Sequence, residues 1–430
     1  MNFLQADRDL ARNSYYAATT SRSQRHAPFS GAIRCDVAIV GGGLAGLSAA
    51  LDLRERGLDV VLLEARELGA GASGRNGGQA IHGLACGQDV IEAQLGLEDA
   101  RRVWDMSIEA LDLLRERIGR HAIACDWRDG FLGVATSPKK ARALDAWADG
   151  LERSYGYPLA RIPAAELPRW IASPRYHGAI HDPRSGHLHP LKYCLGLADA
   201  AQRAGVRLFE GSEVLALEHG RPVRLRTATG EVVADQALLA ANVYLDGLAP
   251  RLSRRIMPVG TYIVCTEPLD RALADSLVPT RSAVCDTDFV LDYFRTTDDD
   301  RMLFGGRVSY STRTPRDLVE SMRRRMVATF PQLAGARIRH AWGGFVDITM
   351  NRAPDFGRLA ANVYYLQGFS GHGLALTGLA GRLVAEAMTA DAGRFDLFAR
   401  LRHRPFPGGD LLRTPALVLG MAWFRLKDLL

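Results

Sequence analysis

Lysine is the scarcest charged residue of this 430-residue chain, with only Lys139, Lys140, Lys192 and Lys427 among 54 basic residues. Arginine supplies the remainder and leaves a formal net charge of +6. A basic excess of this kind permits an anionic partner such as nucleic acid. The arginines are interleaved with Asp and Glu, however, and form no basic stripe, so we expect no nucleic-acid partner.

Cysteine motifs and long apolar runs are absent as well. The six cysteines form no C-x-x-C motif, which argues against a structural zinc site and a disulfide framework. We therefore predict no metal and a reducing, cytoplasmic location. No stretch of about 20 apolar residues occurs, and residues 1–30 lack the apolar core of a signal peptide, so no transmembrane segment is expected. The composition, 47% hydrophobic and 24% charged, is typical of a globular protein with more than one core.

A β-α-β unit is the first clear pattern along the chain. Residues 35–40 and 60–63 are short β-branched runs typical of buried parallel strands. Residues 47–56 between them have helical spacing and end at Gly57. The unit has the length expected of two parallel strands joined by a crossover helix.

The loop of this unit carries the motif Gly41-x-Gly43-x-x-Gly46, and Glu64 ends the second strand. In this context the motif is the dinucleotide-binding fingerprint. Its glycines allow a tight turn, close approach to a pyrophosphate and close helix packing, while the N-terminus of the following helix offers free N–H groups to the phosphates; Leu44 is among the predicted cofactor residues. The carboxylate of Glu64 is suited to accept hydrogen bonds from the adenosine ribose. We predict a bound dinucleotide here.

Two further glycine-rich loops indicate FAD rather than NAD. Residues 71–79 follow the second strand and place Ser73, Asn76 and Gln79 between glycines. Residues 368–373 end a predicted strand and open a helix, whose N-terminus would stabilise negative charge at the flavin N1–C2=O edge. We expect His372 to be a backbone donor with a packed ring rather than a catalytic base. The further residues predicted to contact FAD are Ala72, Ser73, Asn76, Gly77, Gly78, Gln79, Val214, Gly371, His372 and Gly373.

The order of the patterns predicts an α/β fold with a discontinuous Rossmann-like FAD-binding domain and a smaller α+β substrate domain that contains an antiparallel sheet. Residues 297–300 are predicted to be a hairpin turn. The predicted ranges are 1–32 for an N-terminal arm; 33–87, 186–250 and 341–400 for the FAD-binding domain; 88–185 and 251–340 for the substrate domain; and 401–430 for a C-terminal tail.

With these motifs the chain resembles the glycine/D-amino-acid oxidase group of flavoproteins. Within that group it is most similar to enzymes of the gamma-glutamylputrescine oxidoreductase type, over about residues 13–428. The segments that carry this narrower resemblance are Asn13–Ala18, Gly71–Gln79, Gly186–Leu191, Leu291–Arg295, Phe330–Leu333, Phe356–Arg358 and Phe406–Gly409.

The resemblance implies a two-domain flavoprotein that oxidises a primary amine of a gamma-glutamylated polyamine. The product would be an imine that water hydrolyses to an aldehyde and ammonia, with O2 or another acceptor taking the electrons. We hypothesise that Tyr293 and Asp347 shape the amine end of the pocket, although strand packing and a turn role explain them equally well. Residues 72–74 contain no histidine and residues 341–358 no cysteine, so the FAD is expected to be non-covalent.

Departures from the wider group bear on the substrate. The resemblance places Val346 where amino-acid oxidases carry a carboxylate-clamping arginine, and Ala375 where sarcosine-oxidase-like members carry a lysine. Both losses disfavour a free α-amino acid. The alternatives are a D-amino-acid or N-methyl-amino-acid oxidase or dehydrogenase, with Arg352 as its clamp, and a non-catalytic dinucleotide-binding protein. The acceptor and the oligomeric state stay open, and the apolar residues 415–424 are expected to pack on the body of the protein.

Overall fold

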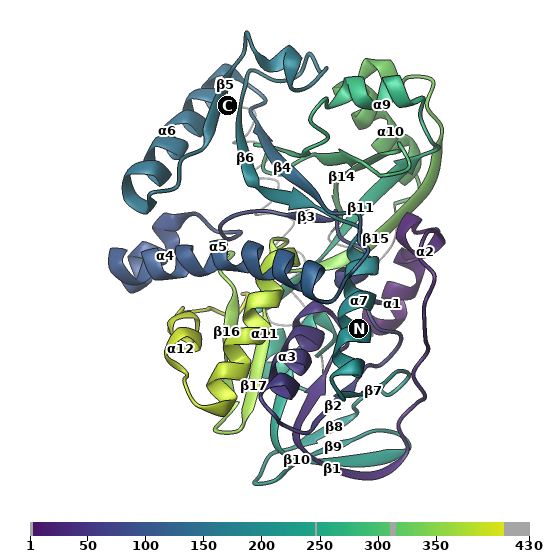
Figure 1. The fold of residues 1–430 in the computed structure, drawn as a ribbon, viewed down its shortest axis with the longest axis vertical. Coiled ribbons are helices and arrows are strands. Elements are labelled where there is room, and N and C mark those ends of the chain that lie inside the picture. The colour runs from purple at the N-terminus through teal and green to yellow at the C-terminus, as the bar shows by residue number, and fades with distance from the viewer. Residues whose placement is uncertain (1–2, 246, 310–314, 408–430) are drawn as a thin grey trace.

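The computed structural model describes residues 3–245, 247–309 and 315–407, whose strands form two sheets stacked along the long axis of the molecule (Figure 1). The first sheet has the order β16-β17-β10-β1-β2-β7, and β9 and β8 continue antiparallel from β10. Its strands are β1 (Gly31–Val40), β2 (Val60–Leu63), β7 (Arg207–Phe209), β8 (Ala216–Glu218), β9 (Val223–Arg226), β10 (Gly230–Leu239), β16 (Asp355–Ala360) and β17 (Val363–Gln367).

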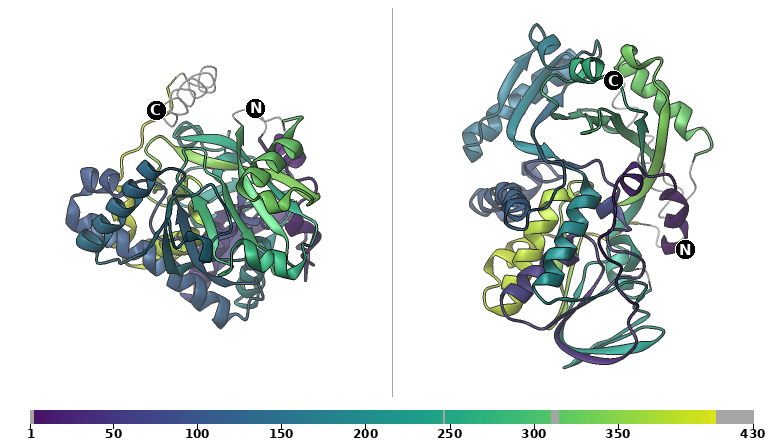
Figure 2. Two further views of the ribbon diagram at one scale, coloured as in Figure 1. Left: turned by 90° about the horizontal axis from the view of Figure 1, so that it is seen from above. Right: turned by 45° about the vertical axis from the view of Figure 1, so that its right-hand side comes forward.

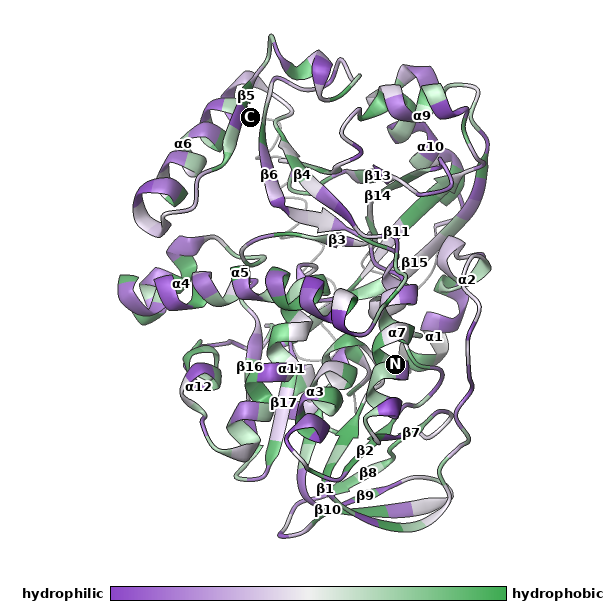
Figure 3. Ribbon diagram, viewed as in Figure 1, coloured by the Kyte–Doolittle hydropathy of each residue, from purple (hydrophilic) through white to green (hydrophobic). Residues whose placement is uncertain are grey.

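The centre of the first sheet is parallel and buried on both faces. Along β1, Val37 and Ile39 join the hydrophobic cluster formed with the helices, while Ala38 and Val40 join the cluster on the β8–β9 side. This two-sided burial explains the uninterrupted apolar run in the sequence, and the lower strands are largely green in Figure 3. The helices on the first face are α3 (Leu44–Glu55), α7 (Pro190–Arg203) and α11 (Gly373–Thr389).

The second sheet is antiparallel except for the β4–β12 pair, and its order is β15-β11-β14-β13-β12-β4-β6-β3, with β5 beside β6. Residues 297–300 link β13 to β14 as the predicted hairpin turn. Its strands are β3 (Gln79–Ala80), β4 (Arg128–Val134), β5 (Ala160–Pro163), β6 (Gly178–His187), β11 (Ile256–Thr266), β12 (Ala283–Asp286), β13 (Tyr293–Thr296), β14 (Met302–Ser309) and β15 (Ile338–Thr349).

The remaining helices surround the two sheets, and α5 lies between the two halves against α11 (Figures 1 and 2). They are α1 (Phe3–Leu10), α2 (Tyr15–Ala18), α4 (Gln88–Leu95), α5 (Leu97–Arg120), α6 (Pro138–Tyr155), α8 (Pro250–Ser253), α9 (Arg271–Leu277), α10 (Leu318–Thr329) and α12 (Gly393–Ala399). None of the described helices combines the length and apolar character that a bilayer-spanning segment requires.

The predicted α/β class with a second, antiparallel sheet is confirmed. Two strands within the ranges predicted for the FAD-binding domain, β3 and β15, pair in the second sheet, so the chain passes between the sheets inside those ranges. The domain boundaries themselves stay a prediction. Residues 408–430, with the predicted apolar tail, lie outside the described residues.

Candidate cofactor site

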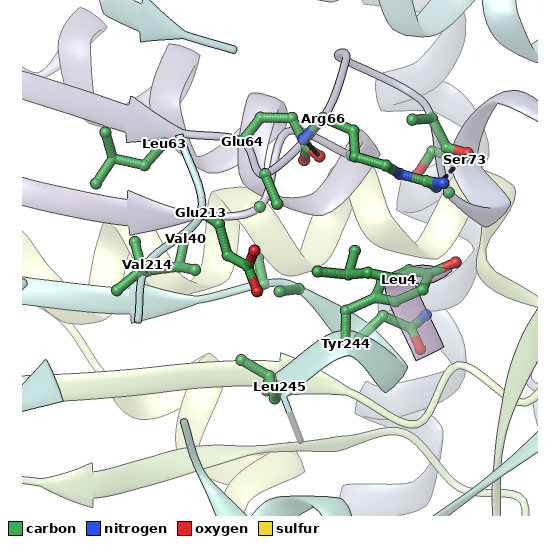
Figure 4. Close-up of a pocket in the computed structure, with 18 of the residues that line it drawn as sticks. Leu4, Val40, Leu63, Glu64, Arg66, Ser73, Glu213, Val214, Tyr244 and Leu245 are labelled. Carbon is green, nitrogen blue, oxygen red and sulfur yellow. Dashed lines mark hydrogen bonds between the residues drawn. The ribbon is translucent and has the colours of Figure 1, made fainter. Parts of the chain in front are cut away.

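A pocket lies where the carboxyl ends of β1, β2 and β10 meet. In open parallel sheets, ligands bind at the carboxyl ends of the strands, at the position where the strand order reverses. Figure 4 shows Glu64 and Ser73 on one side of this pocket and Tyr244 and Leu245 on the other. Of the predicted cofactor residues, those that line it are Gly41, Gly43, Glu64, Ala72, Ser73 and Val214.

At the fingerprint glycines, neighbouring atoms lie so close that a Cβ would overlap with them. Gly41 has φ +111°, and a Cβ there would lie 2.6 Å from the carbonyl oxygen of Ala240. A Cβ on Gly46 would lie 2.0 Å from the carbonyl oxygen of Gly41, so Gly46 permits α3 to pack on β1 rather than lining the pocket. Gly43 caps α3, and a Cβ there would meet the Ser73 Oγ at 2.7 Å. Gly41 and Gly46 therefore provide the predicted tight turn and close helix packing, while the approach of a pyrophosphate at Gly43 stays a prediction.

Glu64 holds its position through two backbone donors. Gly42 N–H donates to Oε2 at 2.7 Å, and Arg66 N–H donates to Oε1 at 2.8 Å. Removal from water raises the pKa of the carboxyl, while these two hydrogen bonds oppose the rise. Each oxygen retains a lone pair for another donor. The carboxylate lines the pocket and is fixed for a ribose hydroxyl.

The second glycine-rich loop wraps against the fingerprint helix. Leu44 N–H donates to the Ser73 Oγ at 2.9 Å, which joins the loop to the first turn of α3. The Asn76 amide donates to the carbonyls of Ala72 and Ser73 at 3.0 and 3.1 Å, and its Oδ1 accepts from Gly78 N–H at 2.8 Å. Leu44 and Asn76 thus shape the loop, and neither is among the residues that line the pocket.

The end of this loop meets the second sheet at Tyr293. A Cβ on Gly77 would lie 2.6 Å from the Tyr293 ring, and one on Gly305 would lie 2.2 Å from it, so the ring is sandwiched between two glycines. Gln79 donates from its side chain to the carbonyls of Val284 and Phe294 at 3.0 and 3.3 Å. Burial raises the pKa of Tyr293, which keeps the phenol neutral. Its contact with substrate stays a prediction.

The third loop closes on the same region from β17. A Cβ on Gly371 would lie 3.7 Å from Val346 Cγ1, and α11 starts at Gly373. The His372 Nε2 lies 3.0 Å from the carbonyl oxygens of both Ile81 and His82. Burial lowers the pKa of His372 to about 4, so the ring is neutral and donates from Nε2. The packed ring of His372 agrees with the prediction. Its backbone N–H, the predicted donor, donates to the carbonyl of Phe369 within the turn.

Asp347 serves the turn before this loop. Its Oδ2 accepts from the N–H groups of Gly368 at 2.5 Å and Phe369 at 3.1 Å, and its side chain is only 3% exposed. Burial raises the pKa of this carboxyl to about 6. A role in the substrate pocket stays a prediction, and its hydrogen bonds match the turn role that the sequence equally allowed.

Several pocket residues carry no sequence motif. Tyr244 follows β10, and Arg66 lies 5.9 Å from the centre of its ring. Leu4 of α1 lines the pocket, and Asp7 of the same helix is buried in ion pairs with Arg66 and, at 2.8 Å, with Arg75. The one available signal was position: residues after a buried parallel strand, such as those after β10, lie at the binding edge of the sheet.

The N-terminal arm was recognised as a motif, and the structure adds its contacts. Tyr16 is fully buried, its ring centre 5.2 Å from that of Trp342. The Trp342 indole N–H donates to the carbonyl of Arg75 at 3.0 Å. Arg295 donates to the Tyr16 hydroxyl at 3.1 Å and to the Gly77 carbonyl at 2.9 Å. The arm and two distant strands therefore support the loop at residues 71–79.

The chemical groups of these residues are suited to binding FAD. The fingerprint leaves no room for a side chain where the pyrophosphate would approach, the first turn of α3 supplies N–H donors, and Glu64 is held for the ribose. His372 of the third loop joins residues 81–82, just beyond the loop at 71–79, through the carbonyls of Ile81 and His82. Within the described residues no set of three His, Cys, Asp or Glu side chains is arranged to hold a metal ion.

Comparisons with known proteins agree with this fit. Residues 36–387 match the DAO family, described as FAD dependent oxidoreductase. The chain is 45% identical to the gamma-glutamylputrescine oxidoreductase of Escherichia coli K12, covering 97% of this chain and 98% of that one. It is 38% identical to the probable oxidoreductase OrdL of Haemophilus influenzae, over 96% and 97% of the two chains.

Solved structures share the fold at lower identity. Glycine oxidase from Geobacillus kaustophilus superposes with a TM-score of 0.71 at 23% identity, covering 84% of this chain and 98% of that one. L-Proline dehydrogenase from P. horikoshii gives a TM-score of 0.68 at 19% identity, with 83% and 94% covered. The fold of this chain is therefore shared with these two proteins of known structure.

Proposed function

The chain belongs to the DAO family of FAD dependent oxidoreductases, and we propose that it oxidises the primary amine of a gamma-glutamylated polyamine of the gamma-glutamylputrescine type. The product is an imine, which water hydrolyses to an aldehyde and ammonia. When bound, FAD accepts the hydride from the carbon next to the amine nitrogen. The residues of the chain bind and orient the two reactants and exclude water.

The observation that carries the proposal is the 45% identity to a protein named gamma-glutamylputrescine oxidoreductase over nearly the full length of both chains. The alignment covers 97% of this chain, so the match extends over both sheets and is not confined to the dinucleotide fingerprint.

The absence of carboxylate anchors supports an amine whose carboxylate is remote from the reacting carbon. Val346 lies against the Gly371 loop where the family resemblance expects a clamping arginine. Ala375, at the position of the expected lysine, is 4% exposed and packs in the core with α3. An α-amino acid would leave its carboxylate without a cation at either position.

Hydride loss requires a neutral amine, whereas a primary alkylammonium has a pKa of about 10 in water. The histidines of this region are neutral, so they add no charge beside the amine. Burial lowers the pKa of His187 and His189 to about 3 and that of His372 to about 4. Desolvation in such surroundings favours the neutral amine.

The cofactor is held without a covalent bond, because Ala72, Ser73 and Gly74 form a short 3-10 turn with no histidine and β15 contains no cysteine. All six cysteines are free thiols, which supports a cytoplasmic location. The electron acceptor is O2 or another small acceptor, and the reaction needs no nucleic acid.

Anaerobic titration of the purified flavoprotein tests the proposal. Gamma-glutamylputrescine is expected to bleach the oxidised flavin absorbance, while glycine, D-alanine and sarcosine leave it unchanged. Bleaching by the amino acids alone would replace the proposal with amino-acid oxidation, and a protein purified without flavin under native conditions would contradict it. Release of the flavin on denaturation checks the non-covalent attachment.

A further inference from the structure

Arg295 differs from the other buried arginines of the described chain. Four arginine side chains are at least nine-tenths buried, and three of them pair with aspartates: Arg75 with Asp7, Arg117 with Asp52, and Arg281 with Asp275 and Asp300. Arg295 is 3% exposed, yet no carboxylate of the described residues lies within 4.0 Å of its guanidinium. A buried charge is costly unless a partner compensates it, so an unpaired one calls for an explanation.

Neutral acceptors surround this guanidinium. It donates to the carbonyls of Gly77 at 2.9 Å and Leu188 at 3.0 Å, and to the hydroxyl of Tyr16 at 3.1 Å. The Nδ1 of His187 lies 3.5 Å from its Nη1. These dipoles satisfy the N–H groups and leave the positive charge without a counter-charge.

The charge of Arg295 affects the pKa values of neighbouring side chains. Burial and then the charge of Arg295 lower the pKa of His187 and His189 to about 3. Burial raises the pKa of Tyr16, and Arg295 opposes that rise. The two histidines therefore stay neutral, and Arg295 is a buried positive charge among neutral hydrogen-bond partners beside the loop at residues 71–79.

Arg295 also lies on the strand that meets this loop. Arg295 and Tyr293 are two residues apart on β13 and therefore share a face of the strand. The Tyr293 ring packs against Gly77, and Arg295 donates to the Gly77 carbonyl. Whatever the loop holds at Gly77 lies within the field of this charge.

We propose that the unpaired charge of Arg295 stabilises the negative charge that the flavin acquires on reduction, with the arginine acting as a positioning residue through Gly77. The proposal rests on the proposed function and concerns its electrostatics. It gives a role to a cation in a region that has no lysine between Lys192 and Lys427. A buried charge acts over several ångströms at low effective dielectric.

Sulfite binding to the oxidised holoenzyme tests the proposal without turnover, since the reversible adduct leaves the flavin ring negatively charged. We expect Arg295→Gln, which retains a hydrogen-bond donor but no charge, to raise the dissociation constant for sulfite about tenfold or more. Arg295→Lys retains the charge with fewer donors and is expected to stay within about threefold of the parent. The midpoint potential of the bound flavin should fall in the Gln variant and stay near the parent in the Lys variant.

Two further variants keep the test decisive if Arg295→Gln fails to fold. His187→Glu retains Arg295 and supplies a counter-charge, so sulfite binding should weaken as in the Gln variant. Tyr16→Phe removes one acceptor and no charge, so sulfite binding should weaken far less than in Arg295→Gln. A loss of sulfite binding in Arg295→Lys or Tyr16→Phe as large as that in Arg295→Gln, or unchanged sulfite binding in His187→Glu, would overturn the proposal and assign Arg295 a packing role alone. Normal bleaching by gamma-glutamylputrescine together with that result would leave the proposed function standing.

Discussion

The two ends of the candidate site are built by different means. At the β1–β2 end, one stretch, residues 41–73, supplies about half of the residues that line the pocket, and α1, residues 213–214 and the segment after β10 supply most of the rest. At the Tyr293 end, side chains from the arm, β13, β15 and the Gly371 loop converge on Gly77. The difference teaches that one contiguous motif forms the framework of the dinucleotide end, while the Tyr293 end is assembled from segments that are all distant in sequence.

The largest effect is expected from Gly41→Ala at the β1–β2 end. The new Cβ would lie 2.6 Å from the Ala240 carbonyl oxygen at a φ of +111°, which costs about 3 kcal/mol or more in backbone strain and overlap. We expect protein without FAD or without a stable fold, measured as the flavin-to-protein ratio after gel filtration. Gly119→Ala in α5, where a Cβ meets no atom within 4 Å, is the matched control and should retain full FAD. A full complement of FAD in Gly41→Ala would show that the fingerprint does not hold the cofactor.

Asp347→Asn should change the pH dependence of stability. Burial raises the pKa of Asp347 from 3.8 to about 6, so the folded protein holds a proton that the unfolded chain releases between these values. Stability contributed by this group is therefore present below pH 3.8 and is lost as the pH rises to about 6. Asparagine does not ionise. The free energy of unfolding of Asp347→Asn, relative to that of the parent, should therefore rise by up to about 3 kcal/mol as the pH increases across this window.

Denaturant unfolding from pH 4 to pH 7 measures this difference. The exposed Asp235, paired with Arg34 at 3.3 Å, supplies a control, since Asp235→Asn should alter stability by less than about 0.5 kcal/mol. A difference between Asp347→Asn and the parent that does not vary with pH would contradict the assigned ionisation. Unchanged kcat and KM in Asp347→Asn would restrict its role to the turn.

Gly77→Ala probes the packing at the Tyr293 end. The added Cβ would lie 2.6 Å from the Tyr293 ring, so the loop or the ring must move. We expect kcat/KM to fall about tenfold while FAD is retained, because a shift of this size misplaces the reacting groups. Tyr293→Leu in the same chain should recover part of the loss if the ring is the obstacle, and a purely additive double variant would show that the two residues are not coupled.

The smallest effect is expected from Tyr293→Phe. Its hydroxyl is the only group removed, and the ring between Gly77 and Gly305 keeps its packing. If the hydroxyl contacts the amine, KM should rise about threefold to tenfold, in line with one hydrogen bond. Steady-state kinetics with gamma-glutamylputrescine measure it, and unchanged kcat and KM would leave Tyr293 with strand packing alone.

Prediction from sequence succeeded where structure is local. The β1-α3-β2 unit, the hairpin turn at 297–300 and the roles of Gly41 and Gly46 follow from patterns within about thirty residues. Tyr244 and the ion pairs of Asp7 carry no such pattern, because only the fold brings α1 and the end of β10 to the pocket. Arg295 was part of a recognised motif, but its lack of a carboxylate partner becomes visible only once its neighbours are placed.

The central strand of the first sheet has a consequence for synthesis and folding. On one side β1 pairs with β2, so that Val40 lies beside Leu63, and on the other side Val40 lies beside Leu239 of β10. β10 in turn pairs with β17, where Leu239 meets Tyr365. During translation β1 and β2 therefore emerge long before the strands that complete their sheet, and such non-local pairing folds slowly. Expression at low temperature or with a chaperone should raise the yield of folded chain, since it protects these early strands until residue 367 has left the ribosome.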